Sequence, residues 1–379
     1  MGLLETTEQE SLRETARRFM RERMPLSHLR QLRDGRSSDG LSREVWRELA
    51  ALGLAGITIP SRHGGMGLGW TELGVVLEEC GRTLAPSPMM STGVLGTTAL
   101  ILGGAPAQLR EWLPLIASGE KLLSLAHDEG SRHAPYDVGT RASLGPDGYR
   151  LQGEKVLVLD GHIADAFIVV SRTSGSLGDR EGLTLFLVPA QASGLHVTRT
   201  LLVDSRNAAR VRLDDVLATP RDILGTLDRG AEVLDPLLDR ARVALSAEML
   251  GSLSEVFERT LAQLKTRRQF GAPIGSFQAL KHRAARLHCE VTRTRAIVTE
   301  AQHALDEDRA TVPLLASATK AKASDTFLHV ANEAVQLHGG MGVTDACDIG
   351  LFLKRARVAA MTFGDGAFHR DRFARLRGY

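Results

Sequence analysis

Residues 267–278 have the sequence Arg-Arg-Gln-Phe-Gly-Ala-Pro-Ile-Gly-Ser-Phe-Gln and separate two long helical patterns in the last third of the chain. The guanidinium group of Arg267 is a planar fork of donors that suits a diphosphate. The Phe-Gly-x-Pro turn interrupts the helix and lets a cofactor or another backbone approach closely. Taken alone, the stretch is more typical of a corner between two helices that carries an exposed arginine.

A second motif follows in residues 336–342, which have the sequence Gln-Leu-His-Gly-Gly-Met-Gly. This motif ends a helical pattern that begins near Ala316, and Gly339 can adopt the left-handed conformation that caps such a helix. The glycines allow backbone N–H groups to face a phosphate, and the Gln336 amide can donate or accept a hydrogen bond. The simpler alternative is a helix C-cap that binds nothing.

Together, R-x-x-F-G-x-P-I-x-x-x-Q and Q-x-x-G-G-x-G, in this order and spacing, resemble the acyl-CoA dehydrogenase family. The resemblance extends over nearly the whole chain. In that family, the two segments hold the ADP portion of an FAD molecule that is bound in a neighbouring subunit. The resemblance therefore implies FAD as the cofactor, with these contact residues: Arg267, Phe270, Gln278, Gln336, Gly339 and Gly340.

The composition is that of an ordinary globular protein. The chain has 379 residues, enough for two or three domains, of which 43% are hydrophobic and 24% charged. A formal net charge of +2 gives no reason to expect a polyanionic partner, so we predict no nucleic-acid binding. Arg17, Arg18, Arg21 and Arg23 lie among acidic and apolar residues at helical spacing, which is typical of a solvated helix face.

Cysteine usage indicates a reducing compartment, and we predict a cytoplasmic protein. Cys80, Cys289 and Cys347 are far apart and form no C-x-x-C motif, so neither a disulfide framework nor a zinc site is indicated. The N-terminus lacks the basic start and apolar core of a signal peptide. We also predict no membrane insertion, since no apolar run approaches the ~18 residues that span a bilayer.

Histidines give no sign of a metal centre in the last third of the chain. No His, Asp or Glu pair there has the spacing of metal ligands, so we predict no metal site. A nucleophile elbow and a Ser-His-Asp arrangement are likewise absent from the sequence. The histidines considered are His282, His288, His303, His329 and His338.

Hydrophobic periodicity divides the chain into three parts. Helical patterns fill residues 1–120, short apolar runs broken by turn residues fill residues 121–227, and helical patterns return in residues 228–379. Helices and strands kept apart in this way favour an α+β class over alternating βαβ units. The resemblance implies the corresponding three domains: an N-terminal helical domain, a middle β-barrel-like domain and a C-terminal helical bundle.

Local signals refine this division. Thr7-x-x-Glu10 predicts a capping box that opens a helix running to Arg23, and Gly53 predicts the end of a helix over 42–52. Residues 145–148 (Gly-Pro-Asp-Gly) predict a hairpin turn. Further predicted helices cover 72–81, 92–102 and 107–117, and predicted strands cover 149–151, 155–159, 166–170, 183–188 and 209–213.

A glycine-rich segment, residues 63–69 (His-Gly-Gly-Met-Gly-Leu-Gly), invites comparison with nucleotide-binding loops. It lacks the Gly-Lys-Ser/Thr of a phosphate-binding loop and the βαβ context of a dinucleotide fold. We therefore predict a structural turn between helices. The family commonly has P-x-x-x-G-G-x-G here, which Pro60, Gly64, Gly65 and Gly67 match.

Residues 239–242 (Asp-Arg-Ala-Arg) resemble the D-x-x-R element with which the family contacts its acyl-CoA substrate. The resemblance makes Asp239 and Arg242 candidate substrate-binding residues. The alternative is an i,i+3 ion pair on a helix surface, which contributes about 0.2–0.5 kcal/mol.

The catalytic base of the family is missing at both of its usual positions. Forming an α,β-double bond in an acyl thioester requires a base at Cα, and the family uses a carboxylate in a pocket that excludes water. One position corresponds to Ala241, just before the Arg of D-x-x-R, and the other to Phe363, just before Gly364. Two relocated candidates remain, Glu248 on the same helix face as Ala241 and Asp365 beside Phe363. For both, the alternative is a structural hydrogen bond or salt bridge.

The flavin-binding motifs of the middle domain are also altered. The family usually has T-E-P in the first strand, where this chain has Asp128-Glu129, and W-I-T in a later one, where it has Leu157-Val158-Leu159. The Trp that packs on the flavin and the Thr that hydrogen-bonds to its edge are thus both Leu. A Leu cannot donate a hydrogen bond, and an unpaired buried acceptor costs ~1–3 kcal/mol.

The motifs that would contact a neighbour's FAD are intact, whereas those that would hold the chain's own flavin are altered. This contrast predicts a heteromer. This pattern resembles the small subunit of two-subunit bacterial acyl-CoA dehydrogenases of the pimeloyl-CoA and steroid side-chain types. The implied partners are an acyl-CoA substrate, a homologous catalytic subunit in a heterotetramer, and an electron-accepting flavoprotein.

Two other hypotheses remain open. One is a self-sufficient homotetrameric acyl-CoA dehydrogenase that uses Glu248 or Asp365 as its base. The other is a non-catalytic binding or scaffold protein on the same fold. Retention of both the Arg267 and the Gln336 motifs weighs against the scaffold, because folding alone does not require both.

Overall fold

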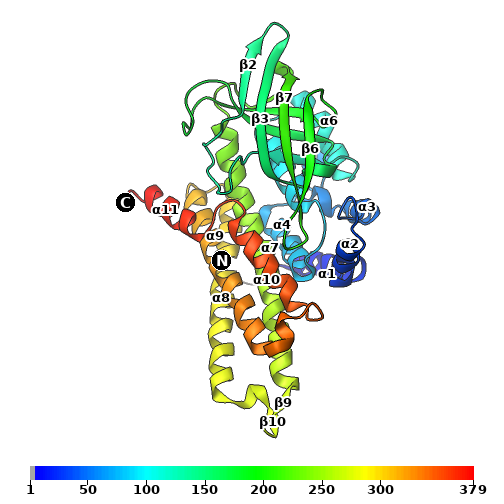
Figure 1. Ribbon diagram of the computed structural model, residues 1–379, viewed down its shortest axis with the longest axis vertical. Helices are drawn as coiled ribbons and strands as arrows, with labels where there is room; N and C mark the ends of the chain where they lie inside the picture. The colour runs from blue at the N-terminus through cyan, green and yellow to red at the C-terminus, as the bar shows by residue number, and fades with distance from the viewer. Residues whose placement is uncertain (1–4) are drawn as a thin grey trace. The chain divides into compact units, whose positions relative to one another are not determined.

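The computed structural model describes residues 5–379 and confirms the predicted order of helices, strands and helices (Figure 1). The first helices are α1 (Thr7–Arg23), α2 (Leu26–Asp34), α3 (Arg43–Ala51), α4 (Trp70–Thr83), α5 (Thr97–Gly103) and α6 (Pro106–Ala117). The last are α7 (Ala231–Thr266), α8 (Gln278–Asp306), α9 (Val312–His338), α10 (Ile349–Met361) and α11 (Gly366–Leu376). Among the helices of residues 5–379, none combines the length and hydrophobicity that a bilayer crossing requires.

Contacts group the chain into two compact units. The first contains Met1–Arg30, Trp70–Ala85 and Arg242–Tyr379, and the second contains Gln31–Gly69 and Pro86–Ala241. Helices of the N-terminal block are therefore shared between the units, and α7 passes through both. The three-domain boundaries after residues 120 and 227 stay a prediction.

The second unit is built on an eight-stranded sheet with the order β6-β7-β3-β2-β4-β5-β8, to which β1 adds by pairing with β4. Figure 1 shows β2, β3, β7 and β6 side by side. All seven residues of β4 are buried, as expected for a strand covered on both faces. The strands are β1 (Leu123–Ala126), β2 (Arg141–Gly145), β3 (Gly148–Leu159), β4 (Ala166–Arg172), β5 (Leu183–Pro189), β6 (Leu195–Leu201), β7 (Asn207–Ala218) and β8 (Ile223–Leu224).

The predicted hairpin turn is confirmed, because Gly145 at the end of β2 pairs with Gly148 at the start of β3. The two strands predicted over 149–151 and 155–159 are in fact one strand, β3. Its pairing with β7 shifts between Leu151 and Gly153, where the hydrophobic pattern breaks, and again between Lys155 and Val158. The sequence showed this interruption but not that the strand continues through it.

Two helix predictions need correction. The N-cap of α1 is Thr6 rather than Thr7: its hydroxyl accepts from Gln9 N (3.2 Å), and the Gln9 side chain accepts from Thr6 N (3.0 Å). A Gln serves a capping box as well as a Glu does, so the box lies one residue earlier.

The helix predicted over 92–102 divides into a π-helical segment, Met89–Gly96, and α5. The Thr92 hydroxyl of that segment hydrogen-bonds to both backbone groups of Leu123 in β1, a tertiary contact that periodicity does not reveal.

In the first unit, glycines allow α4 and α7 to pack backbone against backbone. A Cβ on Gly251 would lie 1.9 Å from the carbonyl oxygen of Glu78, and one on Gly81 would lie 1.9 Å from that of Glu248. Neither neighbour is the end of a flexible side chain, so the two helices could accommodate a methyl group only by moving apart.

This packing predicts a large effect of Gly251→Ala. We expect the free energy of unfolding to fall by about 3 kcal/mol or more, since overpacking forces the backbones apart. Gly350→Ala in α10 is the control, because a Cβ there meets no atom within 4 Å. Alanine is the better helix former, so this variant should be neutral or more stable by up to about 1 kcal/mol. Thermal denaturation of both variants checks the prediction, and equal midpoints would contradict it.

Candidate functional site

The two motifs of the predicted FAD contacts come together in the first unit. Arg267 follows the end of α7, and its Nη1 donates to the carbonyl oxygen of His338, the last residue of α9, over 3.1 Å. A Cβ on Gly339 would lie 3.4 Å from the same nitrogen. The structure thus joins an arginine to a glycine turn that lies 71 residues further along the chain.

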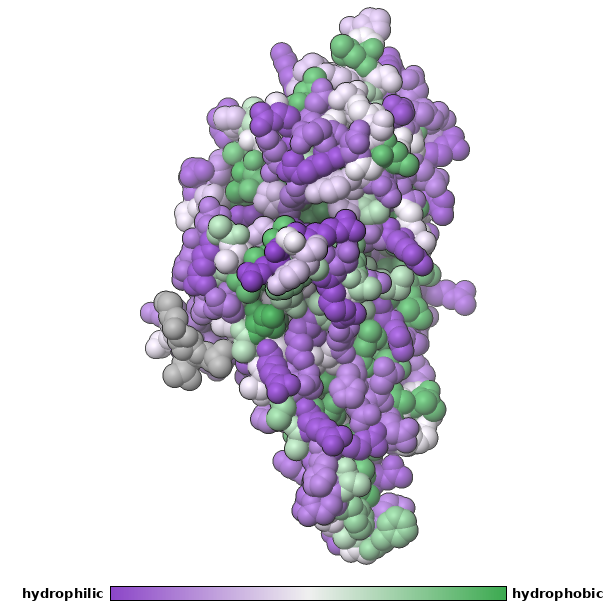
Figure 2. Space-filling view, turned by 90° about the vertical axis from the view of Figure 1, so that its left-hand side faces the viewer, coloured by the Kyte–Doolittle hydropathy of each residue, from purple (hydrophilic) through white to green (hydrophobic). Residues whose placement is uncertain are grey.

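Between α7 and α8 the chain forms a short hairpin of β9 (Arg268–Gln269) and β10 (Ala272–Pro273), at the ends of those helices in Figure 1. Phe270 in its turn is 93% exposed and has a φ of 53°. Figure 2 shows hydrophobic residues at the lower end of the view, the end that carries β9 and β10 in Figure 1. An aromatic ring so exposed gains free energy when a ligand or a partner covers it.

The remaining predicted FAD contacts are accessible as well. Gln278 is the first residue of α8, Gln336 lies in the last turn of α9, and both side chains are exposed. Gly340 is exposed and Gly339 half-buried. Gly339 has a φ of 65° but a ψ of −147°, so the predicted left-handed helical cap is wrong in detail. Only glycine adopts this conformation readily, which leaves its backbone open to a ligand.

Arg267 and the Gln336 amide suit the diphosphate of FAD. An exposed guanidinium beside a glycine turn offers several N–H donors, and only Nη1 is used by the His338 carbonyl. The set therefore fits an anionic group that approaches from outside this chain. Whether each residue contacts FAD stays a prediction.

The D-x-x-R segment does not lie on a helix surface. Asp239 and Arg242 are each only 2% exposed, so the alternative of a surface ion pair is wrong. Arg242 Nε donates to the carbonyl oxygen of Phe363 over 3.3 Å, and its guanidinium lies 5.7 Å from the centre of the Phe368 ring. Arg242 thus holds the backbone at the second of the family's base positions. The substrate contacts of Asp239 and Arg242 remain predictions.

That second base position is held by basic side chains. Lys320, fully buried in α9, donates to the carbonyl oxygens of Ala360 (3.1 Å) and Gly364 (2.9 Å). Nε2 of buried His369 donates to the carbonyl oxygen of Phe363 over 3.0 Å. Burial and then the nearby Arg242 lower the pKa of Lys320 to about 7 and that of His369 to about 2. Each of these two groups therefore uses an N–H to hold the backbone of this loop, and neither is a carboxylate.

Both relocated base candidates have structural partners. Glu248 is 5% exposed, and its Oε1 accepts from Arg355 Nη1 over 3.2 Å, which joins α7 to α10. Asp365 is the N-cap of α11 and accepts from the backbone N–H of Phe368 over 2.8 Å. These are the hydrogen bond and salt bridge that form the alternative to catalysis. The buried Ala241 and Phe363 occupy the usual base positions without a carboxylate.

At the two substituted positions, the middle sheet has only aliphatic side chains to contact a flavin ring. Leu157 lies at the irregularity of β3 with a φ of 53° and is 45% exposed, while Leu159 is 8% exposed. Neither side chain can donate to the edge of a flavin. Glu129 instead accepts from the backbone N–H groups of Gly139 (2.7 Å) and Thr140 (2.9 Å) and from Lys155 Nζ (2.6 Å). These residues therefore do not fit a flavin ring in the way the family's Trp and Thr do.

Sequence analysis missed the buried charges beside this segment. Lys155 is completely buried, and burial lowers its pKa to about 8 although Glu129 opposes the shift. His127 and Asp128 lie next to it, together with His133. Burial lowers the pKa of His127 to about 4. Burial also opposes ionisation of Asp128, but His127 and His133 outweigh it and lower the pKa of Asp128 to about 2. The spacing H-D-x-x-x-x-H was the available signal, and it lies outside the helices whose histidines were considered.

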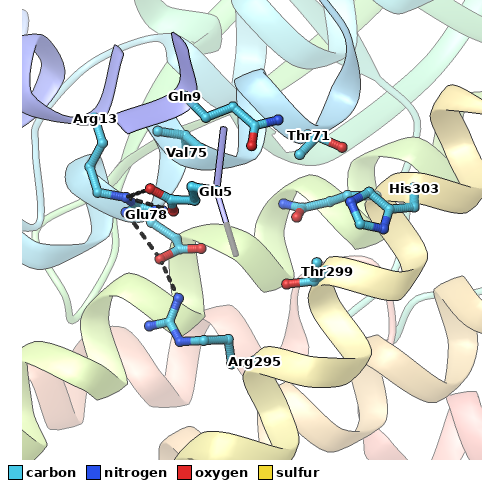
Figure 3. Close-up of a pocket in the computed structure, with 10 residues that line it drawn as sticks. Glu5, Gln9, Arg13, Thr71, Val75, Glu78, Arg295, Thr299 and His303 are labelled. Carbon is cyan, nitrogen blue, oxygen red and sulfur yellow. Dashed lines mark hydrogen bonds and ion pairs between the residues drawn. The ribbon is translucent and has the colours of Figure 1, made fainter. Parts of the chain in front are cut away.

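A small pocket between α1, α4 and α8 is too small for a thioester (Figure 3). It has a volume of about 50 Å³, whereas ligand pockets usually measure about 300–1,000 Å³. Arg13 and Arg295 both bind Glu78 there, over 3.3 and 3.0 Å, so the charges of its lining are paired. Room for a few water molecules is all that it provides.

Family models match three successive segments of the chain. They describe the N-terminal domain of acyl-CoA dehydrogenases over residues 6–120, the middle domain over 127–216 and the C-terminal domain over 228–376. A curated relative, the acyl-CoA dehydrogenase IpdE2 of Mycolicibacterium smegmatis, is 32% identical over 360 residues, which are 94% of this chain and 94% of that protein. The chain belongs to the acyl-CoA dehydrogenase family. FAD is the cofactor of this family, whose enzymes are oxidoreductases that act on CH–CH bonds.

Solved structures of family members agree with this assignment. A variant of the Tcur3481–Tcur3483 steroid ACAD matches with a TM-score of 0.88 and 33% identity over 98% of each chain. The ChsE4–ChsE5 complex from Mycobacterium tuberculosis matches with a TM-score of 0.90 and 26% identity over 100% of this chain and 99% of the other.

The buried lysine of this family member predicts a pH dependence of stability. Because the pKa of Lys320 is lowered to about 7 in the fold, the unfolded chain binds more protons between about pH 7 and pH 10. Stability should therefore rise as the pH increases through this range, and the rise should be smaller in Lys320→Met. Lys322→Met, which alters a partly exposed lysine paired with Glu290, is the control. Denaturation midpoints measured against pH check this, and identical slopes in the wild type and Lys320→Met would contradict it.

Proposed function

We propose that this chain is the FAD-completing subunit of a two-subunit acyl-CoA dehydrogenase whose homologous partner carries the flavin ring and the catalytic base. The observation that carries the proposal is a contrast within one chain. The exposed Arg267 motif is assembled against the turn after His338, whereas both positions of the family's base hold apolar residues.

The contacts around Phe363 support a base in the partner. Arg242, Lys320 and His369 all donate to the backbone of this loop, and the carboxylate that the loop itself carries, Asp365, caps α11. Moving Asp365 to the substrate would cost the cap of α11, worth about 0.5–2 kcal/mol. Protonation of Glu248 would remove the negative charge from its buried ion pair with Arg355, which is more costly still.

In the proposed assembly, the cofactor and the partner subunit carry out the chemistry, and this chain binds the cofactor. Bound FAD supplies the hydride acceptor at the substrate Cβ, and a carboxylate of the partner removes the proton at Cα. This chain's residues bind and orient the cofactor: the Arg267 guanidinium and the Gln336 amide face the diphosphate, and Phe270 covers part of the ADP moiety. No proton is moved by Ala241 or Phe363, since neither side chain titrates.

Two of the similar solved structures support a heteromer by their names, since each pairs two proteins, Tcur3481 with Tcur3483 and ChsE4 with ChsE5. We extend the proposal to an acyl-CoA substrate held beside Asp239 and Arg242 and to an electron-accepting flavoprotein that reoxidises the complex. None of the three cysteines, Cys80, Cys289 and Cys347, forms a disulfide within residues 5–379, which supports a cytoplasmic location.

Arg267→Ala tests the proposal on the complex of this chain with its homologous subunit. We expect FAD affinity to fall about 10- to 100-fold, because a hydrogen bond to a charged group contributes about 1.5–3 kcal/mol. Arg268→Ala is the matched control: Arg268 is the exposed neighbour in β9, it donates to the carbonyl oxygen of Gly271, and it should leave FAD binding unchanged. Flavin fluorescence titration of the apo complex gives both affinities.

Three results would contradict the proposal. Equal affinities of the two variants would remove Arg267 from the FAD site. A chain that is yellow and fully active without a partner would exclude the heteromer. A complex with neither flavin nor dehydrogenation would favour the scaffold hypothesis.

Glu248→Gln and Asp365→Asn separate the proposal from a self-sufficient enzyme. We expect turnover of the active complex to change less than about 3-fold, whereas loss of a general base costs about 100- to 10,000-fold. Glu248→Gln should still lower the free energy of unfolding by about 1–3 kcal/mol, because Arg355 keeps a hydrogen-bond acceptor but loses its counter-charge. Steady-state kinetics and thermal denaturation measure both effects, and a collapse of turnover in either variant would identify a base in this chain.

A further inference from the structure

Three side chains with metal-binding atoms meet where β1 leaves the sheet. His127 and Asp128 directly follow β1, and His133 returns to them from the segment that leads to β2. The ligand atoms of these three residues all lie within 4.8 Å of one another. The side chains of His127 and His133 are 5% and 2% exposed and that of Asp128 is 22% exposed, so the group is nearly closed to solvent.

The hydrogen bond of His127 to the backbone fixes how its ring can act. Nε2 lies 2.9 Å from the carbonyl oxygen of Pro135. A carbonyl oxygen only accepts, so Nε2 must carry the proton, and the neutral ring then presents the lone pair of Nδ1. That lone pair faces Asp128 Oδ1 at 3.4 Å, which is also an acceptor. Two acceptors in contact inside a protein repel each other unless a proton or a metal cation lies between them.

A backbone carbonyl that binds one ring nitrogen while the other is free to ligate is the usual support of a metal-binding histidine. The distances fit as well. Zinc with bonds of about 2.0–2.1 Å in a tetrahedral site requires its ligand atoms to lie about 3.3 Å apart. In the structure, Asp128 Oδ1 lies 3.4 Å from His127 Nδ1 and 3.1 Å from His133 Nδ1.

The surrounding charges leave room for a cation. Lys155 Nζ donates to the carbonyl oxygen of His127 over 3.1 Å, but its charge is matched by Glu129 at 2.6 Å. When both imidazoles are neutral, the carboxylate of Asp128 is the one charge that the three proposed ligands bring. Two neutral imidazoles and one carboxylate are a ligand set that zinc commonly takes.

We propose that His127, Asp128 and His133 bind a divalent transition-metal ion, Zn²⁺, with a fourth position left to water or another oxygen ligand. The ion fastens the segment between β1 and β2 onto the end of β1, in the place where the family has its T-E-P motif. The site is independent of the proposed heteromer, because all of its ligands come from one segment of this chain.

The full-length chain, stripped with a chelator and dialysed, is titrated with Zn²⁺ and separately with Co²⁺. We expect one ion per chain by elemental analysis, and visible cobalt bands typical of a tetrahedral site. Asp128→Asn and His133→Ala should each weaken zinc binding by at least about 100-fold, since even the loss of a supporting residue costs about 10- to 100-fold. His196→Ala, at an exposed histidine of β6 in the same unit, is the control and should bind like the wild type.

Less than about one tenth of an ion per chain would overturn the proposal, as would equal zinc affinity in the wild type, Asp128→Asn and His133→Ala. In that case His133 Nδ1 simply donates to Asp128. Hydrogen exchange of residues 127–140 gives a second readout that needs no variant. Added zinc should slow exchange in this segment and leave β6 unchanged, and an unaffected segment would again overturn the proposal.

Discussion

The hydrogen bond from Arg267 to the carbonyl oxygen of His338 is the contact on which the functional account depends. It joins the end of α7 to the end of α9 and thereby places a guanidinium beside a glycine turn. It uses one donor of Arg267, so the remaining N–H groups face outward on an exposed side chain. No other part of residues 5–379 covers Phe270, and 93% of this residue is exposed. We propose that this outward-facing group of residues contacts the FAD of a neighbouring subunit.

The second constraint is the loss of carboxylates at the positions that need them. Phe363 and Gly364 keep the backbone path with positive φ angles of 58° and 102°, and buried donors from α7, α9 and α11 hold their carbonyl oxygens. Order at this loop is therefore maintained without a catalytic side chain. Arg242 thus has a structural role, separate from the substrate contact predicted for it.

Much of the fold followed from the sequence because local signals and tertiary contacts agree there. The change from helices to strands near residue 121, the turn at Gly145–Gly148 and the return of helices after residue 228 are examples. Errors arose where a tertiary contact outweighs a local one. The Thr92 hydroxyl hydrogen-bonds to β1, and the segment around it is π-helical instead of α-helical. Gly339 has a ψ outside the range of the left-handed helical cap that was predicted.

The candidate site was less accessible to sequence reasoning. Motif spacing selected Arg267 and Gln336 as candidates. For Asp239 and Arg242, spacing left a surface ion pair open, and only their burial excludes it. The sequence did not indicate that Lys155 and Lys320 are buried, because lysine rarely is. Burial is tolerated only because Lys155 pairs with Glu129 and Lys320 donates to backbone carbonyl oxygens.

The position of the flavin ring in a structure of the FAD-loaded complex tests the central claim most directly. The account predicts a ring seated in the middle domain of the homologous partner, with its diphosphate against Arg267 of this chain. A ring packed between Leu157 and Leu159 of this chain, next to a carboxylate of its own, would contradict it.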